Sequence, residues 1–376
     1  MSASAPATGQ DSLLASLNGI PQVDFPANLQ AAVTAGRRMT PILREVVALR
    51  IGPGRLTPNE YFWYRLWEPQ LTRGEKRRFI GKQAQQPMHI ACNNTGWYAT
   101  AADKLLFHTL MTGAGLPTPE LLAITHPARR VSRVQVLAGQ DAIAAFLRSP
   151  THYPIFAKPI DGKYSLAVVN ADRYDAATDQ VLLRGDAPVS AADLAESLAE
   201  REAGFLLQRR LEPAPEVAEL FGSRLWSVRV LLLVTPAGPL IHSAVAKIPT
   251  GQNPADNFWR AGNMLGAIDK ETGLVSRVVQ GTGAEMVVNP AHPDTGLSIV
   301  GQRIPGWASL MTMAEEASRL LPGLRTQSWD IALSAAGPVP LEVNFGGDLN
   351  LAQLAYGAGV LDDRYEGHLR RCGYRI

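Results

Sequence analysis

Apolar positions in the first quarter of the chain recur at helical spacing. Thr40-Pro41, a capping residue followed by proline, precedes ILREVVALRI, and Gly52-Pro53-Gly54 ends that segment. Thr57-Pro58 repeats the start signal before YFWYRLWEPQL, whose clustered aromatic side chains favour a packed core over a ligand cage. We therefore expect a helical N-terminal region over residues 26–99, after a disordered lead-in over residues 1–25.

Helical and strand patterns alternate from residue 100 onwards. The segment TAADKLLFHTLMT, residues 100–112, has helical periodicity and is closed by Gly113 and Gly115. Further segments are typical of strands at 120–125, 153–158, 165–170, 205–211, 223–234 and 239–248, and of helices at 141–148, from Ser190, and near 309–321. A hairpin follows near 328–345. This order predicts a mixed α/β fold.

Composition narrows the classes of function. The 36 basic and 34 acidic residues give a net charge of +2 without a long block of either sign, which disfavours nucleic-acid binding. The longest apolar run, Val230 to Val234, is far below the roughly 20 residues of a membrane helix. The first residues lack the basic and apolar regions of a signal peptide. We expect a cytoplasmic protein with no nucleic-acid or membrane partner.

The two cysteines carry no recognisable site in the sequence. Cys92 and Cys372 are far apart and form no CxxC or zinc-finger pattern. A zinc finger or a secreted disulfide scaffold is therefore not expected. The histidines His89, His108, His242 and His292 have no partner at a catalytic spacing and are interpreted as structural.

The C-terminal hairpin brings carboxylates together. A turn centred on Ala336 between WDIAL and VPLEVN makes Asp330 and Glu342 cross-strand neighbours, with Asn344 on the same face. Facing carboxylates repel unless a cation lies between them, and this set of oxygen ligands suits Mg²⁺. A hairpin with a solvated polar face explains the pattern equally well.

Two lysines stand at positions suited to phosphate. Lys158 ends the apolar run IFA and is followed by the loop DGKYS, whose backbone amides and ammonium charge suit phosphate oxygens. The loop is not a Walker-type P-loop, because the glycine pattern and the following helix are missing. Lys104 begins an apolar helix beside Asp103. The alternatives are an exposed hairpin for Lys158 and a solvent-facing position for Lys104.

Two further features concern polar residues near or within apolar strands. The strand ending in Leu206-Leu207-Gln208 leaves the sheet through RRLEP, and such a hinge could contact the edge of an adenine. Arg229 and Lys247 lie inside strongly apolar strands, where an unpaired charge is costly. Each of these two residues either faces solvent or has an anionic partner.

Together and in this order, these segments resemble the ATP-grasp superfamily. DKLLFHTLMTGAGLPTP resembles its opening helix, YPIFAKPIDGKYS its lysine strand and phosphate loop, LLQRRLEP its adenine hinge, and WDIALSAAGPVPLEVN its metal hairpin. SVRVLLL, ADNFWRAGNMLGAID and HPDTG resemble the group of sugar-transfer-associated ATP-grasp proteins, and the match runs from Thr100 to Gln353. The resemblance implies two α+β lobes that clasp ATP, with an N-terminal part at 100–212 and a C-terminal part at 213–376.

The resemblance also implies roles for individual residues. The ATP phosphates would be held by Lys104, Lys158 and the loop residues Gly162, Lys163 and Ser165. Adenine would meet the segment of Gln208, Arg209 and Leu211, and ribose would meet Glu216. Mg²⁺ would be bound by Asp330, Glu342 and Asn344, while Arg229 and Lys247 would face the transferred phosphoryl group and the oxyanion of an acyl intermediate.

The activity implied by the resemblance is that of an ADP-forming ligase. A carboxylate attacks the γ-phosphate of ATP, and an amine captures the acyl phosphate. We expect small-molecule carboxylate and amine substrates, ATP and Mg²⁺, a sugar-linked or secondary-metabolite pathway, and a homodimer as an oligomeric state that the sequence allows. The alternatives are a kinase with a hydroxyl acceptor on the same scaffold and a nucleotide-binding module without turnover.

Overall fold

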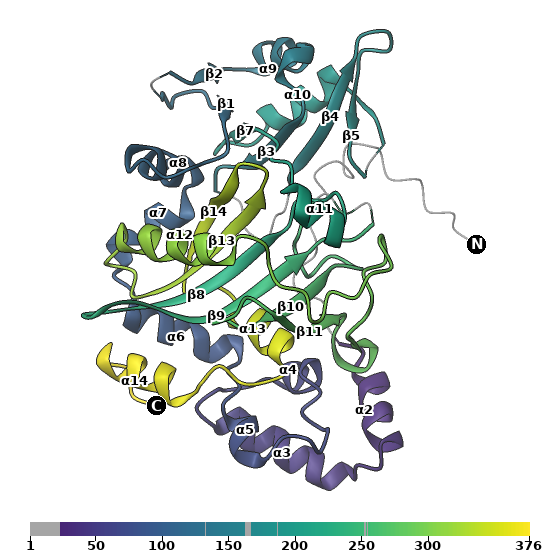
Figure 1. Ribbon diagram of the computed structural model, residues 1–376, viewed down its shortest axis with the longest axis vertical. Helices are drawn as coiled ribbons and strands as arrows, with labels where there is room; N and C mark the ends of the chain where they lie inside the picture. Colours follow the sequence, from purple (N-terminus) through teal and green to yellow (C-terminus); the bar gives the residue numbers. More distant parts are fainter. Residues whose placement is uncertain (1–22, 132, 162–166, 186, 252, 254) are drawn as a thin grey trace. The chain divides into compact units, whose positions relative to one another are not determined.

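The computed structural model describes residues 23–376 except 132, 162–166, 186, 252 and 254. The chain divides into two compact units (Figure 1). Unit 1 consists mainly of Ala102–Glu212, and unit 2 combines Pro21–Ala101, Pro213–Gly251 and Phe258–Ile376. Each unit contains one β-sheet and several helices, so the predicted mixed α/β composition is confirmed.

Unit 1 contains a seven-stranded sheet with the order β2-β1-β7-β3-β4-β5-β6. Its strands are β1 (Leu121–Thr125), β2 (Gln135–Leu137), β3 (Ile155–Pro159), β4 (Val169–Asp175), β5 (Gln180–Leu183), β6 (Val189–Ser190) and β7 (Phe205–Arg209). Its helices are α8 (Lys104–Gly113), α9 (Gln140–Leu147), α10 (Ala191–Ala199) and the 3-10 helix η2 (Pro150–His152). Apolar side chains of α9 and α10, such as Phe146 and Leu194, pack with Ile155 and Leu207 of the sheet to form the main core.

Unit 2 contains an antiparallel seven-stranded sheet with the order β12-β11-β10-β9-β8-β13-β14. The strands are β8 (Ser227–Thr235), β9 (Gly238–Ile248), β10 (Met264–Ile268), β11 (Val275–Gln280), β12 (Val287–Val288), β13 (Thr326–Ser334) and β14 (Gly337–Phe345). Helix α12 (Trp307–Arg319) packs on β8, β9, β13 and β14, and α13 (Leu349–Tyr356) packs on β9, β10 and β11. The remaining helices of this part are α11 (Pro215–Phe221), α14 (Asp363–Arg371) and the 3-10 helix η3 (Gly283–Glu285).

The N-terminal helices belong to unit 2. They are α2 (Phe25–Thr34), α3 (Met39–Ile51), α4 (Pro58–Trp63), α5 (Arg73–Arg77), α6 (Lys82–Cys92), the 3-10 helix η1 (Thr95–Trp97) and α7 (Tyr98–Ala102). Gln353 of α13 is fully buried and accepts a hydrogen bond from the backbone N–H of Ile80 at 2.6 Å. Its amide also donates to the carbonyl of Ile80 and to the hydroxyl of Tyr64, both at 2.9 Å. These bonds tie the helical region directly to the sheet-bearing part.

Two predicted helices differ in the structure. The helix expected over residues 100–112 is divided into α7 and α8, because Asp103 is extended and caps α8 by accepting from the N–H groups of Leu105 and Leu106. Helix α3 begins at Met39, before the predicted cap Thr40, because a proline is tolerated anywhere in a first turn whose N–H groups have no partner. In the part of the chain that is described, no helix has the length and hydropathy needed to cross a bilayer.

Candidate active site

The hairpin of β13 and β14 has the register predicted for its polar residues. Asp330 pairs with Glu342, and Ser328 pairs with Asn344, so the facing carboxylates are confirmed. The predicted turn position is wrong, because Ser334 pairs with Gly337 and the turn residues are Ala335 and Ala336. A bulge between Asp330 and Ile331 compensates for that shift. Without the bulge, the register would slip by one residue and turn one carboxylate to the opposite face.

Asp330 forms ion pairs with both cations predicted in the apolar strands. Arg229 of β8 donates to it from Nε and Nη2, both at 2.7 Å, and Lys247 of β9 donates from Nζ at 2.9 Å. Lys247 also donates to the Ser227 hydroxyl at 3.3 Å. Arg229, Asp330 and Glu342 are register partners on β8, β13 and β14, and Lys247, which pairs with Ser227, lies two residues further along on β9. We call these two cations and two carboxylates the charged row. Of the two alternatives for these cations, the structure selects an anionic partner.

The opposite charges of this row keep Asp330 and Arg229 ionised despite their burial. Only 2% of Asp330 is exposed, and burial alone would raise its pKa, but the charges of Arg229 and Lys247 hold the pKa well below the ordinary value. Burial alone would lower the pKa of Arg229, but Asp330, Glu342 and Asp348 together raise it above its ordinary value. Arg229 and Asp330 are therefore both charged at neutral pH.

The oxygen donors of the hairpin are suited to a hard cation. Glu342 is half-buried beside Asp330, and its charge reaches Arg229. The Asn344 amide has a buried nitrogen with no hydrogen-bond partner among the described residues, so protein hydrogen bonds do not fix its orientation from that side. Both oxygens of Asp330 already accept from cations. Glu342 and Asn344 therefore fit Mg²⁺ better than Asp330 does.

Just after β14, the backbone at Gly346 packs closely against the ring of His89. Gly346 and Gly347 have φ values of +93° and +68°, a backbone conformation that favours glycine. A Cβ atom on Gly346 would lie 2.0 Å from Nδ1 of His89. Burial lowers the pKa of His89 to about 4, so its imidazole is neutral and acts in packing. Asp348 follows the two glycines and caps the N-terminus of α13. Its Oδ2 lies 3.5 Å from Nζ of Lys82.

Two of the predicted nucleotide residues of unit 1, Lys158 and Gln208, lie on one face of its sheet. Lys158 pairs with Leu206, and Gln208 pairs with Phe156, so these side chains share a face of the neighbouring strands β3 and β7. Leu105 of α8 packs against Leu206. Helix α8 therefore covers the face that holds Lys158 and Gln208, while α9 and α10 cover the opposite face.

The start of α8 brings Lys104 toward Lys158. The backbone N–H of Lys104 donates to the carbonyl of Ile160 at 3.0 Å, which fastens α8 to the end of β3. His108 lies one turn further along α8, and its pKa is lowered first by burial and then by the charge of Lys158. Two lysines beside a neutral imidazole form a basic environment that suits phosphate oxygens.

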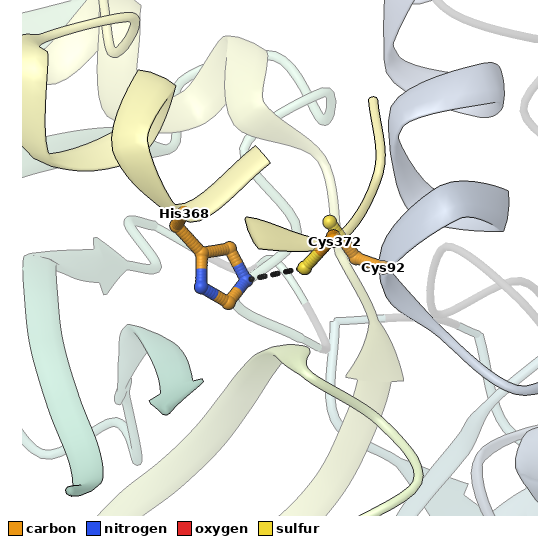
Figure 2. A group of neighbouring side chains, drawn as sticks. All are labelled: Cys92, His368 and Cys372. Carbon is orange, nitrogen blue, oxygen red and sulfur yellow. Dashed lines mark hydrogen bonds between the residues drawn. The ribbon is translucent and has the colours of Figure 1, made fainter. Parts of the chain in front are cut away.

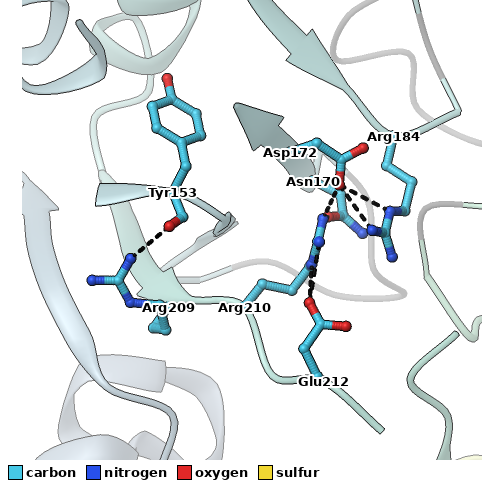
Figure 3. Close-up of polar contacts among 7 residues, drawn as sticks. All are labelled: Tyr153, Asn170, Asp172, Arg184, Arg209, Arg210 and Glu212. Carbon is cyan, nitrogen blue, oxygen red and sulfur yellow. Dashed lines mark hydrogen bonds and ion pairs between the residues drawn. The ribbon is translucent and has the colours of Figure 1, made fainter. Parts of the chain in front are cut away.

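The side chain of Arg209 has a structural role. Its Nη1 donates to the carbonyl of Tyr153 at 2.9 Å (Figure 3). The same nitrogen donates to the carbonyl of His152, the last residue of η2, at 2.7 Å. Its backbone N–H donates to the carbonyl of Glu120. The neighbouring Leu211 is half-buried after the end of β7. The guanidinium of Arg209 is therefore bound to backbone carbonyls of unit 1.

A network around Arg210 was not predicted from the sequence. Arg210 pairs with Asp172 of β4 and with Glu212, and it donates to the amide oxygen of Asn170 at 3.0 Å (Figure 3). Arg184 adds a second pairing to Asp172 at 2.9 Å. Burial opposes ionisation of Asp172, but its hydrogen bonds with the two arginines lower its pKa. The network holds the segment that leaves β7 against β4.

Four further residues were predicted to contact the nucleotide, namely Gly162, Lys163, Ser165 and Glu216. Gly162, Lys163 and Ser165 lie outside the described residues. The neighbouring Asp161 is exposed and accepts from Arg201 at 2.6 Å. Glu216 is exposed in the first turn of α11, which belongs to unit 2, whereas Gln208 belongs to unit 1.

The chain is similar to several solved structures at low sequence identity. D-alanine-D-alanine ligase from Coxiella burnetii is 11% identical over 75% of this chain and 60% of its own, with a TM-score of 0.42. L-amino acid ligase from Bacillus licheniformis is 12% identical over 73% of this chain and 49% of its own, with a TM-score of 0.38. Biotin carboxylase from Campylobacter jejuni is 11% identical over 76% of this chain and 49% of its own, with a TM-score of 0.41.

The family assignment comes from the sequence. The chain spans about half to three-fifths of the solved chains that it matches. No curated protein is similar enough to the chain to count as a relative. The model of the family described as sugar-transfer associated ATP-grasp matches residues 85–366, which is most of the chain. The predicted resemblance is thus confirmed, and the chain belongs to the sugar-transfer associated ATP-grasp family.

Proposed function

We propose that the protein is an ATP-dependent, ADP-forming ligase that joins a small-molecule carboxylate to an amine through an acyl phosphate. Members of the ATP-grasp superfamily are ATP-dependent carboxylate-amine ligases, and the chain belongs to this superfamily. The observation that carries the proposal is the row of Arg229, Lys247, Asp330 and Glu342 across the sheet of unit 2. A buried row of fixed charges is the arrangement that stabilises charge developing on a phosphoryl group.

In this proposal, Glu342 and Asn344 hold Mg²⁺, with Asp330 at the edge of the set. The bound ion would shield the negative charge of the ATP phosphates during phosphoryl transfer. Asp330 acts mainly as the counter-ion that positions Arg229 and Lys247, because both of its oxygens accept from them. Asp330, which the sequence predicted as a metal ligand, is therefore assigned mainly to binding Arg229 and Lys247.

Arg229 and Lys247 stabilise the transferred group. The bidentate pair with Asp330 uses Nε and Nη2 of Arg229, and a guanidinium has a further nitrogen with two donor hydrogens. We assign Nη1 of Arg229 and the ammonium of Lys247 to the phosphoryl oxygens and to the oxyanion of the tetrahedral intermediate. Because Asp330 fixes both cations before substrate binds, little reorganisation is needed when charge develops.

Unit 1 supplies the nucleotide contacts in this proposal. Lys104 and Lys158 bind the phosphates by charge, since both lie near the start of α8 and the end of β3. The backbone of Gln208 and Leu211 contacts adenine, and the Arg210 network keeps that segment in position. Gly162, Lys163 and Ser165 complete the phosphate loop, and Glu216 contacts ribose.

Product analysis tests the proposal. The protein is incubated with Mg-ATP and pooled amino acids, uronic acids and amines, and ADP, phosphate and new products are measured by chromatography and mass spectrometry. A condensed product that appears in equal amount with ADP and phosphate is expected. A stable phosphorylated acceptor without free phosphate would replace the ligase with a kinase, and ATP binding without any ADP would leave only the non-catalytic module.

A further inference from the structure

Two cysteines and a histidine that are far apart in the sequence meet in unit 2. Cys92 is the last residue of α6, His368 belongs to α14, and Cys372 follows the end of α14 (Figure 2). The two sulfur atoms and one ring nitrogen all lie within 4.8 Å of one another. Among the described residues, this is the group of three or more His, Cys, Asp or Glu side chains that could hold a metal ion. It is separate from the row around Asp330.

The local structure holds the three side chains in place. His368 and Cys372 are separated by one helical turn and so lie on the same face of α14. Asn93, which follows Cys92, accepts from the N–H of Thr326 at 2.9 Å and donates to its carbonyl at 3.2 Å. The Thr326 hydroxyl lies 3.1 Å from Nε2 of His368. Thr326, at the start of β13, therefore contacts both His368 and the residue next to Cys92.

The spacing of the group fits tetrahedral zinc. Sγ of Cys372 lies 3.5 Å from Nε2 of His368. With Zn–S near 2.3 Å and Zn–N near 2.1 Å, a tetrahedral site places sulfur and nitrogen about 3.6 Å apart. Soft thiolates and imidazole select zinc over magnesium or calcium. The group therefore has the ligand types and the separation of a zinc site in the absence of the ion.

The surroundings also favour a bound cation. Cys92 and His368 are buried, and the two sulfur atoms and the ring nitrogen of the group lie close to one another. Cys372 is only half-buried, which leaves the site a route to solvent. A thiolate is the form of cysteine that binds metal.

We propose that Cys92, His368 and Cys372 bind one Zn²⁺ ion that fastens α14 to α6. Zn²⁺ replaces the protons of the Cys92 and Cys372 thiols, which are released to water, and both cysteines bind as thiolates. A water molecule that enters past Cys372 takes the fourth position. The unfolded chain does not hold these three ligands together, so the ion stabilises the folded state by an amount that grows with the logarithm of its affinity. The pairing of His368 and Cys372 at a distance of one helical turn is the sequence signal that the analysis of cysteine spacing missed.

Metal analysis of the intact protein tests this site. The protein is expressed without a metal-binding tag, purified without chelator, and analysed for metals by mass spectrometry. We expect about one zinc per chain in the wild type and in the Arg371→Gln control, whose exposed side chain is next to the site. Cys372→Ser and His368→Gln should each lose most of the zinc. Removal of zinc by a strong chelator should lower the melting temperature of the wild type but not that of Cys372→Ser.

A second measurement does not depend on the folding of the variants. Co²⁺ titrated into reduced, metal-free wild type should give the charge-transfer band of thiolate ligation, and one equivalent of Zn²⁺ should remove it. Absence of this band together with zinc-free protein would overturn the proposal. So would a disulfide between Cys92 and Cys372, detected by mass spectrometry of protein that is alkylated at lysis and digested without reduction. An equal zinc content in Cys372→Ser and wild type would place the metal elsewhere.

Discussion

Asp330 is the residue on which the charged row of unit 2 depends. It accepts three hydrogen bonds from two cations, and it is almost fully buried. Removing one partner of a buried ion pair leaves the other charge uncompensated, which costs about 3–5 kcal/mol. Glu342 is half-buried on the neighbouring strand and is less involved in holding these cations. The two carboxylates of the hairpin therefore contribute differently to stability.

Asp330→Asn should lower the free energy of unfolding by about 3 kcal/mol or more, because Arg229 and Lys247 lose their buried counter-ion. Glu342→Gln should lower it by less than about 1 kcal/mol. Urea unfolding of both variants at neutral pH measures the difference. Equal stability of the two variants would show that Asp330 is not the counter-ion of these cations.

His89 makes stability depend on pH. Its pKa is about 4 in the folded protein and about 6.5 in an unfolded chain. The unfolded state therefore binds more protons between these values, so the free energy of unfolding should fall as pH falls from about 6.5 to about 4. The slope contributed by His89 is at most about 1.4 kcal/mol per pH unit, and above pH 7 the residue contributes no slope.

Unfolding measured from pH 4 to pH 8 checks this effect. In His89→Gln, the slope that belongs to His89 should disappear. The loss of stability in this variant, relative to wild type, should be constant above pH 7 and should shrink toward pH 4. Parallel stability curves for the two proteins would contradict a buried neutral imidazole.

At the scale of elements, the β13–β14 hairpin and its ends set the geometry of the site. Gly337 begins β14 and Gly346 follows it, and their φ values, +94° and +93°, are nearly equal. A Cβ atom on Gly337 would meet nothing within 4 Å, whereas a Cβ atom on Gly346 would overlap the ring of His89. The two positions thus separate the cost of backbone strain from that of a clash.

Gly337→Ala should lower the free energy of unfolding by about 1 kcal/mol, which is the cost of a positive φ for alanine. Gly346→Ala should cost about 1–3 kcal/mol more, because His89 must move. Thermal or urea unfolding of both variants measures this difference. If the two variants were equally stable, His89 would not be packed against the backbone of Gly346.

The elements also show what local sequence could and could not predict. The facing of Asp330 and Glu342 followed from the period of two in strands and from a short turn, although the prediction depended on a bulge that no local pattern shows. The pairing of Arg229 with Asp330 requires β8 and β13 to be neighbours, which only the whole sheet decides. The same holds for Cys92 and His368, which lie in helices from opposite ends of the sequence.

At the scale of the whole molecule, the N-terminal helices and the C-terminal part form one compact unit. Periodicity predicted these helices, but nothing in the sequence indicated that Gln353 would bind the backbone of Ile80. Within unit 1, apolar runs predicted the strands near Lys158 and Gln208, and the alternation of side chains placed both on one face. Local pattern thus predicts elements, while long-range pairing decides which residues meet.

Gln353→Leu should lower the free energy of unfolding by about 3 kcal/mol or more, because both backbone groups of Ile80 and the Tyr64 hydroxyl lose a buried partner. The control Gln302→Leu removes one hydrogen bond near the surface, to the Ser298 carbonyl, and should cost less than about 1 kcal/mol. Urea unfolding followed by tryptophan fluorescence compares them. Similar losses of unfolding free energy in both variants would contradict a stabilising role for the buried hydrogen bonds of Gln353.

The most direct test of the proposed function is the dependence of ADP formation on Mg²⁺ in matched variants. With the substrates found by product analysis, wild type and the control Glu316→Gln, whose side chain is exposed on α12, should form ADP at equal rates and only with Mg²⁺. Glu342→Gln and Lys158→Met should each lower kcat/KM at least tenfold, with Glu342→Gln folded as stably as predicted above. Wild-type turnover by Glu342→Gln at every Mg²⁺ concentration would contradict the metal-binding hairpin and, with it, the proposed mechanism.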